Sequence, residues 1–149
     1  MKIEQVLESD LFALKGLAER SLNSDVDASE EERAFLLPHI QDDIEKAMGD
    51  ENCIFLKIEN TETLGYILIK DCWNLLHLFI EPGKTNMGLG RKLISEAILQ
   101  VKSVENRGYL ALNSSKNALP FYKKMGFEVD LSRKPKSQSS TPMRLNFGD

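Results

Sequence analysis

The stretch LLHLFIEPGKTNMGLGRKL, residues 75–93, joins an apolar strand to a helix that opens on two glycines. The strand is expected to end at Glu81-Pro82-Gly83, because Pro and Gly interrupt strands strongly. Beyond this turn, apolar side chains recur at a helical spacing: Leu89, Leu93, Ile94, Ala97, Ile98 and Val101. Glycine costs a helix interior roughly 0.5–1 kcal/mol relative to alanine. Gly88 and Gly90 at the head of this helix therefore need a specific reason.

A bound phosphate is one such reason. The P-loop pattern fails because Leu89 stands where lysine is required, and the Rossmann pattern fails because Leu93 replaces its third glycine. A helix N-terminus still carries unpaired backbone N–H groups and a partial positive charge, so a pyrophosphate can lie against the amides of residues 88–91. Three basic residues add positive charge there: Lys84, Arg91 and Lys92. The alternative, from this stretch alone, is a tight turn that binds nothing.

Two helices are expected before residue 50. The first follows a cap at residues 9–10 and shows apolar residues at a helical spacing. The second begins at a capping-box pattern, Ser29 with Glu32 three residues later. Pro38 is expected to break this second helix, because an interior proline removes a hydrogen bond and clashes with the preceding turn. A further turn or two then continues to Gly49, a residue typical of a helix end.

Short apolar runs between turn residues predict the strands of a sheet. They fall at residues 2–7, 53–58, 64–70, 74–80, 109–113, 127–131 and 141–147, and a short helix is expected around residues 117–125. Residues 53–70 read as an antiparallel hairpin, whereas residues 74–113 form a strand–helix–strand unit. The fold class is therefore α+β or mixed α/β, with a single sheet and one domain over residues 1–149.

The composition narrows the choice of partners. The 149 residues carry a formal net charge of −4 and a pI of about 5.3, which disfavours nucleic acid as a partner. The two cysteines and two histidines fit neither a disulfide scaffold nor a zinc site, so no metal is expected. The N-terminus lacks the apolar segment of a signal peptide, and no apolar run approaches the length of a membrane span. We therefore expect a cytoplasmic protein without a membrane partner.

A second stretch, ALNSSKNALPFYKKMGFEV at residues 111–129, reads as strand, turn, short helix and strand. Taken together with residues 75–93, it resembles the GCN5-related N-acetyltransferase (GNAT) family. In that family a strand runs into an Arg/Gln-x-x-Gly-x-Gly/Ala turn at a helix head, and a later helix ends in a phrase like Phe-Tyr-x-Lys-x-Gly-Phe. Residues 121–127 carry the later phrase, in the family's order and spacing. The resemblance covers nearly the whole chain and is strongest over residues 64–129.

The resemblance implies a mixed, mostly antiparallel sheet of about six or seven strands with about four helices, and acetyl-CoA as co-substrate. In the family, the helix head binds the CoA pyrophosphate, and the strand before it pairs its backbone with the pantetheine arm. That strand splays from the next one, here residues 109–113, and the thioester lies in the gap. By match, the cofactor-binding residues are Leu78, Phe79, Ile80, Thr85, Asn86, Met87, Gly88, Leu89, Gly90, Arg91, Ser115 and Asn117.

Tyr122 matches the family's frequent general acid. The resemblance implies that an amine attacks the thioester carbonyl and that CoA leaves as a thiolate. A phenol with a pKa near 10 can protonate that sulfur or donate a hydrogen bond to it. The alternative for Tyr122 is a core tyrosine on an amphipathic helix.

The base that accepts the proton of the attacking amine is not marked in the sequence. Family members with a strand base have it at positions matching Asn74 or Leu76, and neither residue is a base. Alternation along the strand would place these two residues with Leu78 on one face and His77 on the other. His77 is therefore expected to be structural. Glu81 is a weak second candidate that we expect to be a solvated loop charge, and a water chain to bulk is a further route.

Three departures from the family pattern keep other hypotheses open. Thr85 stands where Arg or Gln is usual, Asn86 where Gly is common, and Ser115 where many members have Asn. The leading hypothesis is an acetyl-CoA-dependent N-acetyltransferase whose acceptor is a small-molecule or protein amine. The second is a non-catalytic module that binds or senses acyl-CoA, and the third is a relative that shares only the fold. The acceptor is not marked in the sequence, and the resemblance allows a homodimer.

Overall fold

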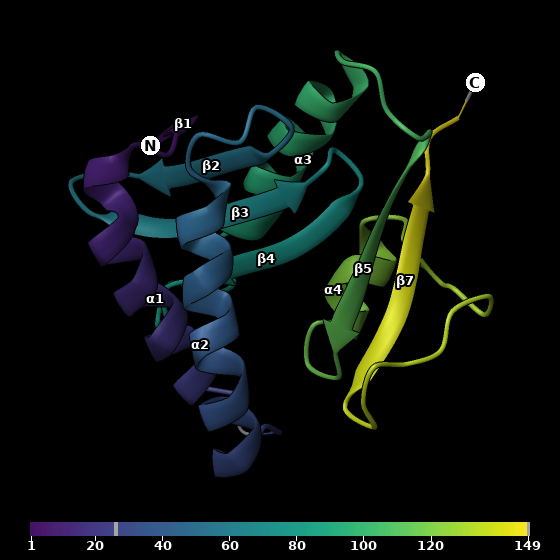
Figure 1. Ribbon diagram of the computed structural model, residues 1–149, viewed down its shortest axis with the longest axis horizontal. Coiled ribbons are helices and arrows are strands. Elements are labelled where there is room, and N and C mark those ends of the chain that lie inside the picture. The colour runs from purple at the N-terminus through teal and green to yellow at the C-terminus, as the bar shows by residue number, and fades with distance from the viewer. Residues whose placement is uncertain (26, 149) are drawn as a thin grey trace.

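The computed structural model describes residues 1–25 and 27–148, which form one seven-stranded sheet with helices on both faces (Figure 1). The strands are β1 Lys2–Gln5, β2 Ile54–Glu59, β3 Thr63–Lys70, β4 Asn74–Ile80, β5 Tyr109–Ser115, β6 Glu128–Val129 and β7 Ser140–Asn146. Their order across the sheet is β1-β2-β3-β4-β5-β7-β6. The β4–β5 pair is parallel and the other neighbouring pairs are antiparallel. The mixed, mostly antiparallel sheet is therefore confirmed.

The helices are α1 Leu11–Asn23, α2 Glu30–Ala47, α3 Leu89–Lys102 and α4 Leu119–Lys124, with a short 3-10 turn at Glu8–Asp10. In Figure 1, α1 and α2 lie in front of the β2–β4 half of the sheet, and α3 lies behind it. Each face encloses its own apolar cluster, one with α1 and α2 and one with α3 and α4. No helix in the described part of the chain is long and apolar enough to cross a membrane.

The expected break at Pro38 is wrong, because α2 is continuous from Glu30 to Ala47. The start of the helix is as predicted: the Ser29 hydroxyl accepts the Glu32 N–H at 3.1 Å. Pro38 lies on the exposed side of α2, and so does Ala34, whose carbonyl loses its usual helical donor. Water can reach that carbonyl, while the opposite face of the helix is buried. Tertiary packing therefore outweighs the proline penalty.

We predict that Pro38→Ala raises the free energy of unfolding by about 1–2 kcal/mol, because it restores the helical hydrogen bond but also makes the unfolded chain more flexible. Urea denaturation followed by circular dichroism measures this. Gln41→Ala, one turn further along α2, is the control and should change stability by less than about 0.5 kcal/mol. A destabilised Pro38→Ala protein would mean that the backbone restriction imposed by proline contributes more to stability than the restored hydrogen bond.

Candidate functional site

Strands β4 and β5 are joined at one point. Asn74 pairs with Ala111, and the Ala111 N–H donates to the Trp73 carbonyl at 2.8 Å. Within the described residues, this is the one residue pair that the two strands form. Beyond this bridge β4 stays with β3 while β5 stays with β7, so the two halves of the sheet diverge (Figure 1). The facing backbone N–H and C=O groups of β4 and β5 are therefore left for another partner.

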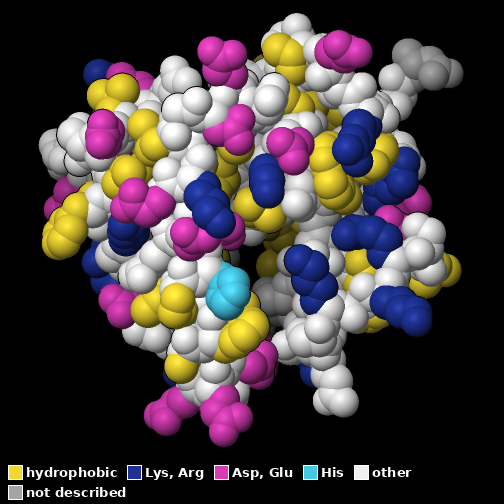
Figure 2. All heavy atoms as spheres, viewed as in Figure 1, with side chains coloured by type: hydrophobic (Ala, Val, Ile, Leu, Met, Phe, Trp, Pro, Cys, Tyr) yellow, Lys and Arg dark blue, Asp and Glu magenta, His cyan; other side chains and the backbone are white. Residues whose placement is uncertain are grey.

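The molecular surface is hollowed between the α1–α2 side and the β5–β7 side (Figure 2). Two side-chain hydrogen bonds join these sides. The Asn117 amide donates to an Asp25 carboxylate oxygen at 2.8 Å, and the Ser139 hydroxyl donates to Glu32 at 2.9 Å. Asn117, a predicted cofactor-binding residue, thus lies beside the divergence, and its amide is bound by Asp25 in the segment between α1 and α2. Ser115, at the end of β5, uses its hydroxyl to accept a backbone N–H of the following turn at 3.3 Å.

The head of α3 has the features of an anion site. Gly88 precedes the helix with φ at 77°, in the left-handed region, and a Cβ added there would meet nothing within 4 Å. The Lys92 N–H makes a helical bond to the Gly88 carbonyl at 3.1 Å, so the amides of Leu89, Gly90 and Arg91 precede the helical ladder. An open space above unpaired amides at the positive end of a helix dipole fits a pyrophosphate.

Gly90 has a role that the sequence did not indicate. A Cβ at Gly90 would lie 3.3 Å from the Phe121 ring and 4.0 Å from the Ile80 side chain. Gly90 therefore lets α3 pack closely against α4 and the end of β4. Of the two glycines in this motif, Gly88 is the one that combines an open approach with a backbone conformation that favours glycine. The Gly-x-Gly motif and the Phe-Tyr motif thus touch each other through Gly90 and Phe121.

The turn before α3 is exposed at Thr85, Asn86 and Met87, and Asn86 has φ at 67°. A left-handed conformation is one that asparagine tolerates better than most residues, which accounts for Asn in place of the family's frequent glycine. The Leu89 side chain is buried, so this residue can offer a ligand its backbone amide but not its side chain. The predicted cofactor residues of this turn are thus brought together on one exposed loop.

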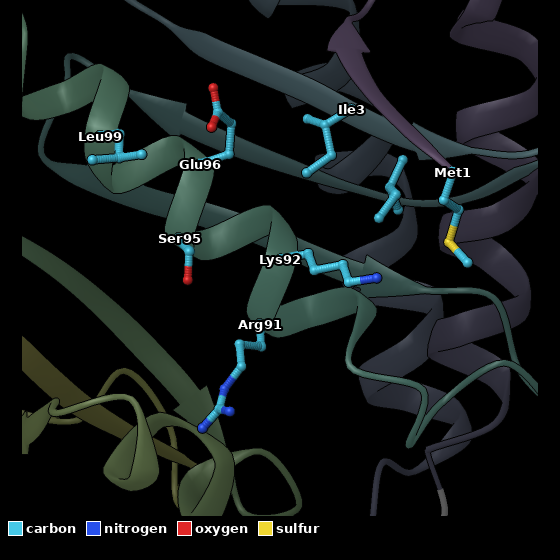
Figure 3. A pocket seen from close by; sticks show the side chains of 8 residues that line it. Met1, Ile3, Arg91, Lys92, Ser95, Glu96 and Leu99 are labelled. Atoms are coloured by element: carbon cyan, nitrogen blue, oxygen red, sulfur yellow. The ribbon is translucent and has the colours of Figure 1, made fainter.

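Arg91 and Lys92 point in different directions (Figure 3). Arg91 extends toward the part of the molecule that contains α4, on the side of the divergence. Lys92 extends toward Met1, along a shallow pocket between α3 and β1 that Arg91 also borders. Arg91 can therefore add positive charge near the helix head, whereas the expectation that Lys92 does so is not supported by its orientation.

A bulge in β4 changes which side chains share a face. Leu68 of β3 pairs with His77, but Ile69 pairs with Leu75, so Leu76 is an extra residue. Leu76 packs in the α1–α2 cluster, and Leu78 packs in the cluster on the opposite face. The expectation that these two share a face is therefore wrong, because strict alternation fails at a bulge.

His77 is 3% exposed and is held from both sides. Its Nδ1 lies 3.1 Å from the Tyr66 hydroxyl, and its Nε2 lies 3.0 Å from an Asp43 carboxylate oxygen. Burial, with a contribution from the Asp43 charge, raises the pKa of Tyr66 well above its usual value. Glu81 is held as well, since Arg20 Nε donates to both of its carboxylate oxygens at 2.9 and 3.0 Å. Neither His77 nor Glu81 is placed to act as a free base.

Tyr122 lies on α4 with its ring between Phe121 and Phe127, at centroid distances of 5.3 and 5.5 Å. Burial raises the pKa of its phenol above the usual value, so the hydroxyl stays protonated at neutral pH. This hydroxyl forms no hydrogen bond with the described residues. The hydroxyl oxygen is also still in contact with solvent. In the described chain, the fully buried side-chain N or O atom without a hydrogen-bond partner is Arg33 Nε, and the Tyr122 oxygen is not such an atom. Tyr122 can therefore donate a hydrogen bond to a ligand.

Comparisons with known proteins agree with this arrangement. The profile of the acetyltransferase (GNAT) domain family matches residues 24–147. The chain therefore belongs to the GNAT family of acetyltransferases, enzymes that take acetyl-CoA as co-substrate. A search of curated proteins gives no significant match.

Three solved structures illustrate the shared fold. A PaiA N-acetyltransferase from Thermoplasma acidophilum, in complex with coenzyme A, is 21% identical with a TM-score of 0.80, over 98% of each chain. A ribosomal-protein-alanine N-acetyltransferase from Brucella melitensis is 14% identical with a TM-score of 0.69, over 99% of this chain and 100% of that one. An aminoglycoside 6'-N-acetyltransferase complexed with coenzyme A is 14% identical with a TM-score of 0.71, over 98% and 97%.

We predict that Tyr66→Phe lowers the free energy of unfolding by about 1–3 kcal/mol, because it leaves a buried His77 nitrogen without its partner. Tyr109→Phe is the matched control, since the Tyr109 hydroxyl forms no hydrogen bond in the described chain, and should cost less than about 0.5 kcal/mol. Urea denaturation of both variants measures the difference. Equal effects would show that the Tyr66–His77 contact contributes nothing to stability.

Proposed function

We propose that this protein transfers an acetyl group from acetyl-CoA to a primary amine by direct attack, in the gap where β4 and β5 diverge. The observation that carries the proposal is the single backbone bridge at Asn74 and Ala111. It leaves two facing strand edges unpaired beside an open helix head and a protonated tyrosine. A ligand that carries an amide-containing arm, a pyrophosphate and a thioester needs a partner for each part. The strand edges, the helix head and the tyrosine offer these partners in that order.

Each part of the ligand has a partner of matching chemistry. Acetyl-CoA supplies the acetyl group as a thioester. The free backbone edge of residues 78–80 offers N–H and C=O groups to the amides of the pantetheine arm. The amides of residues 88–91 and the Arg91 guanidinium offer donors to the pyrophosphate, beside the turn at residues 85–87. Ser115 and Asn117 lie at the end of β5, on the other side of the divergence.

Tyr122 is proposed to act on the leaving sulfur. A thiol has an ordinary pKa of about 8.5, so CoA leaves as a thiolate that a hydrogen-bond donor stabilises. Because burial raises the pKa of the Tyr122 phenol, the hydroxyl keeps its proton until the sulfur becomes negative. It then donates a hydrogen bond, as a general acid does.

The attacking amine must also lose a proton. His77 is engaged by Tyr66 and Asp43, and Glu81 is engaged by Arg20. We infer that the proton passes to water in the hollow of Figure 2 rather than directly to a side chain. The names of the similar structures range from a ribosomal-protein-alanine to an aminoglycoside acetyltransferase. The acceptor class therefore has to come from this chain's own surface.

Calorimetric titration of acetyl-CoA tests the cradle at the head of α3. We expect micromolar binding, roughly −8 kcal/mol at a Kd of about 1 μM. Gly88→Glu should weaken it by more than about tenfold, because it places a bulky anion where the pyrophosphate would lie. Gly49→Glu is the matched control: Gly49 also has a left-handed φ, 80°, with nothing within 4 Å of an added Cβ, but it lies after α2.

Equal weakening in the two glycine variants would point to a general loss of stability and would remove the cradle from the proposal. Binding without turnover of any amine would return the protein to the second hypothesis, a module that binds or senses acyl-CoA. No binding to the unmodified protein would leave a family fold with a disabled cofactor site.

We predict that Tyr122→Phe lowers kcat by about 10²-fold, within the range typical of general acid catalysis, and leaves acetyl-CoA affinity unchanged. The ring and its packing remain, so only the hydroxyl proton is removed. Steady-state release of CoA thiol, alongside calorimetry, separates the two quantities. An unchanged kcat would remove Tyr122 from the mechanism and assign it to the core.

A further inference from the structure

The two sides of the divergence carry opposite charge. Residues 1–70 contain seven Lys or Arg against 16 Asp or Glu, whereas residues 103–149 contain eight against four. The first segment forms β1–β3 with α1 and α2, and the second forms β5–β7 with α4. Figure 2 shows Lys and Arg side chains gathered over the β5–β7 side of the hollow, with Asp and Glu side chains prominent on the α1–α2 side. A ligand that crosses the hollow therefore meets an acidic wall and a basic wall.

The basic wall includes a built group of side chains, which we name the arginine face: Arg107, Trp73, Tyr109 and Arg144. The Arg144 guanidinium lies 3.6 Å from the Tyr109 ring centroid, and the Arg107 guanidinium lies 4.6 Å from the Trp73 ring. The two rings are 6.2 Å apart in an edge-on arrangement. Figure 1 shows no helix in front of β5 and β7, so this part of the sheet face is uncovered.

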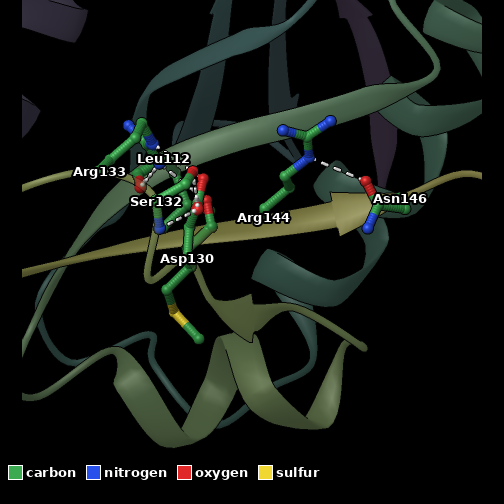
Figure 4. Close-up of polar contacts among 7 residues, drawn as sticks. Leu112, Asp130, Ser132, Arg133, Arg144 and Asn146 are labelled. Atoms are coloured by element: carbon green, nitrogen blue, oxygen red, sulfur yellow. Dashed lines mark hydrogen bonds and ion pairs between the residues drawn. The ribbon is translucent and has the colours of Figure 1, made fainter.

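The two guanidinium groups have donors to offer. In Figure 4, Arg144 uses its Nε to donate to Asn146 at 2.8 Å, while its other two nitrogens extend away from β7 without a dashed contact. Arg133, in the same view, is instead tied to Asp130 and to the carbonyls of Leu112 and Met143. Within the described chain, no carboxylate lies within 4.0 Å of a charged nitrogen of Arg107 or Arg144.

Stacking on an aromatic ring holds a guanidinium in place while its N–H groups remain free. A planar fork of donors held in this way matches a carboxylate, which accepts two parallel hydrogen bonds. Two such forks on an uncovered face fit a partner with more than one carboxylate. The overall net charge of −4 does not favour an acidic partner, so the local arrangement rather than the total charge must select it.

The arginine face begins where the gap begins. Arg144 pairs with Ala111, and Ala111 pairs with Asn74 at the single bridge between β5 and β4. Adjacent strands are about 4.8 Å apart, so the backbone of Arg144 lies about 10 Å from that of Asn74. An extended peptide advances about 3.3 Å per residue and crosses this distance within three to four residues. A chain with its end in the gap therefore places its next residues over the arginine face.

We propose that the acceptor is a polypeptide whose terminal amine enters the gap and whose following residues are acidic and bind the arginine face. This inference rests on the proposed function and names its substrate class. The acidic α1–α2 wall, which includes the partly exposed Asp43, attracts the cationic amine and repels the carboxylates. The basic wall attracts the carboxylates and repels the cationic amine. The charges of the two walls therefore set the direction in which the peptide lies.

Three peptides with the same N-terminal alanine, followed by a run of glutamate, glutamine or lysine, test the proposal. Initial rates of CoA thiol release give kcat/KM for each. We expect the glutamate peptide to exceed the glutamine peptide by about tenfold or more, with the lysine peptide lowest, and the preference to shrink as sodium chloride rises from about 50 to about 300 mM. The double variant Arg107→Gln/Arg144→Gln should remove the preference and leave the glutamine peptide within about twofold.

Lys2→Gln is the control, because it removes a positive charge from β1, on the far side of the sheet from β5 and β7, and should leave the preference intact. Equal kcat/KM for the three peptides, or a loss in the double variant that is the same for all three, would overturn the inference. Acetylation of small amines such as lysine or a polyamine, with no peptide accepted, would also overturn it while the proposed function stands. Acetyl-CoA binding without acetylation of any amine would remove both.

Discussion

The single backbone bridge between β4 and β5 is the constraint on which the rest of the structure depends. The Asn74–Ala111 pair, in which the Ala111 N–H donates to the Trp73 carbonyl, joins two halves of a sheet that otherwise diverge. A continuous sheet would satisfy its backbone groups internally and would leave no room for a ligand. Because pairing stops after one bridge, two strand edges face each other across a gap that a peptide-like arm can fill. The parallel direction of the pair puts the helix head of α3 and the start of α4 at the same end of that gap.

Packing around the bridge fixes the elements that surround the gap. Gly90 lets α3 approach Phe121, the chain neighbour of Tyr122, so one contact sets the position of the helix head relative to α4. The Arg20–Glu81 ion pair ties α1 to the end of β4, and the hydrogen-bonded Asp43–His77–Tyr66 group ties α2 to β4 and β3. These contacts hold α1 and α2 against the β3–β4 side of the gap. The opposite side is formed by β5 and β7 and carries the opposite charge. The boundary between acidic and basic surface therefore coincides with the gap between the two halves of the sheet.

Much of this arrangement follows from local sequence patterns. The strand, turn and Gly-x-Gly helix at residues 75–93 and the Phe-Tyr-Lys-Lys-Met-Gly-Phe phrase identify the sheet, its parallel pair and the position of Tyr122. The Pro38 expectation failed because a buried helix face outweighs a local propensity. The β4 bulge was not visible because Leu75 and Leu76 are both leucine, so the pattern is the same with or without an extra residue. Asp43 was missed because its partner is 34 residues away in the chain. The arginine face was missed because it joins residues from two loops and two strands that are far apart in the sequence.

Amide hydrogen exchange with and without saturating acetyl-CoA is the measurement that tests the role of the gap most directly. We predict that acetyl-CoA slows exchange at two places: the free edge of residues 78–80 and the helix head at residues 88–91, where unpaired amides would gain partners. The outer strands β1 and β2 should exchange at unchanged rates. Acetyl-CoA binding that protects other segments and leaves these two unaffected would show that the ligand does not occupy the gap between β4 and β5.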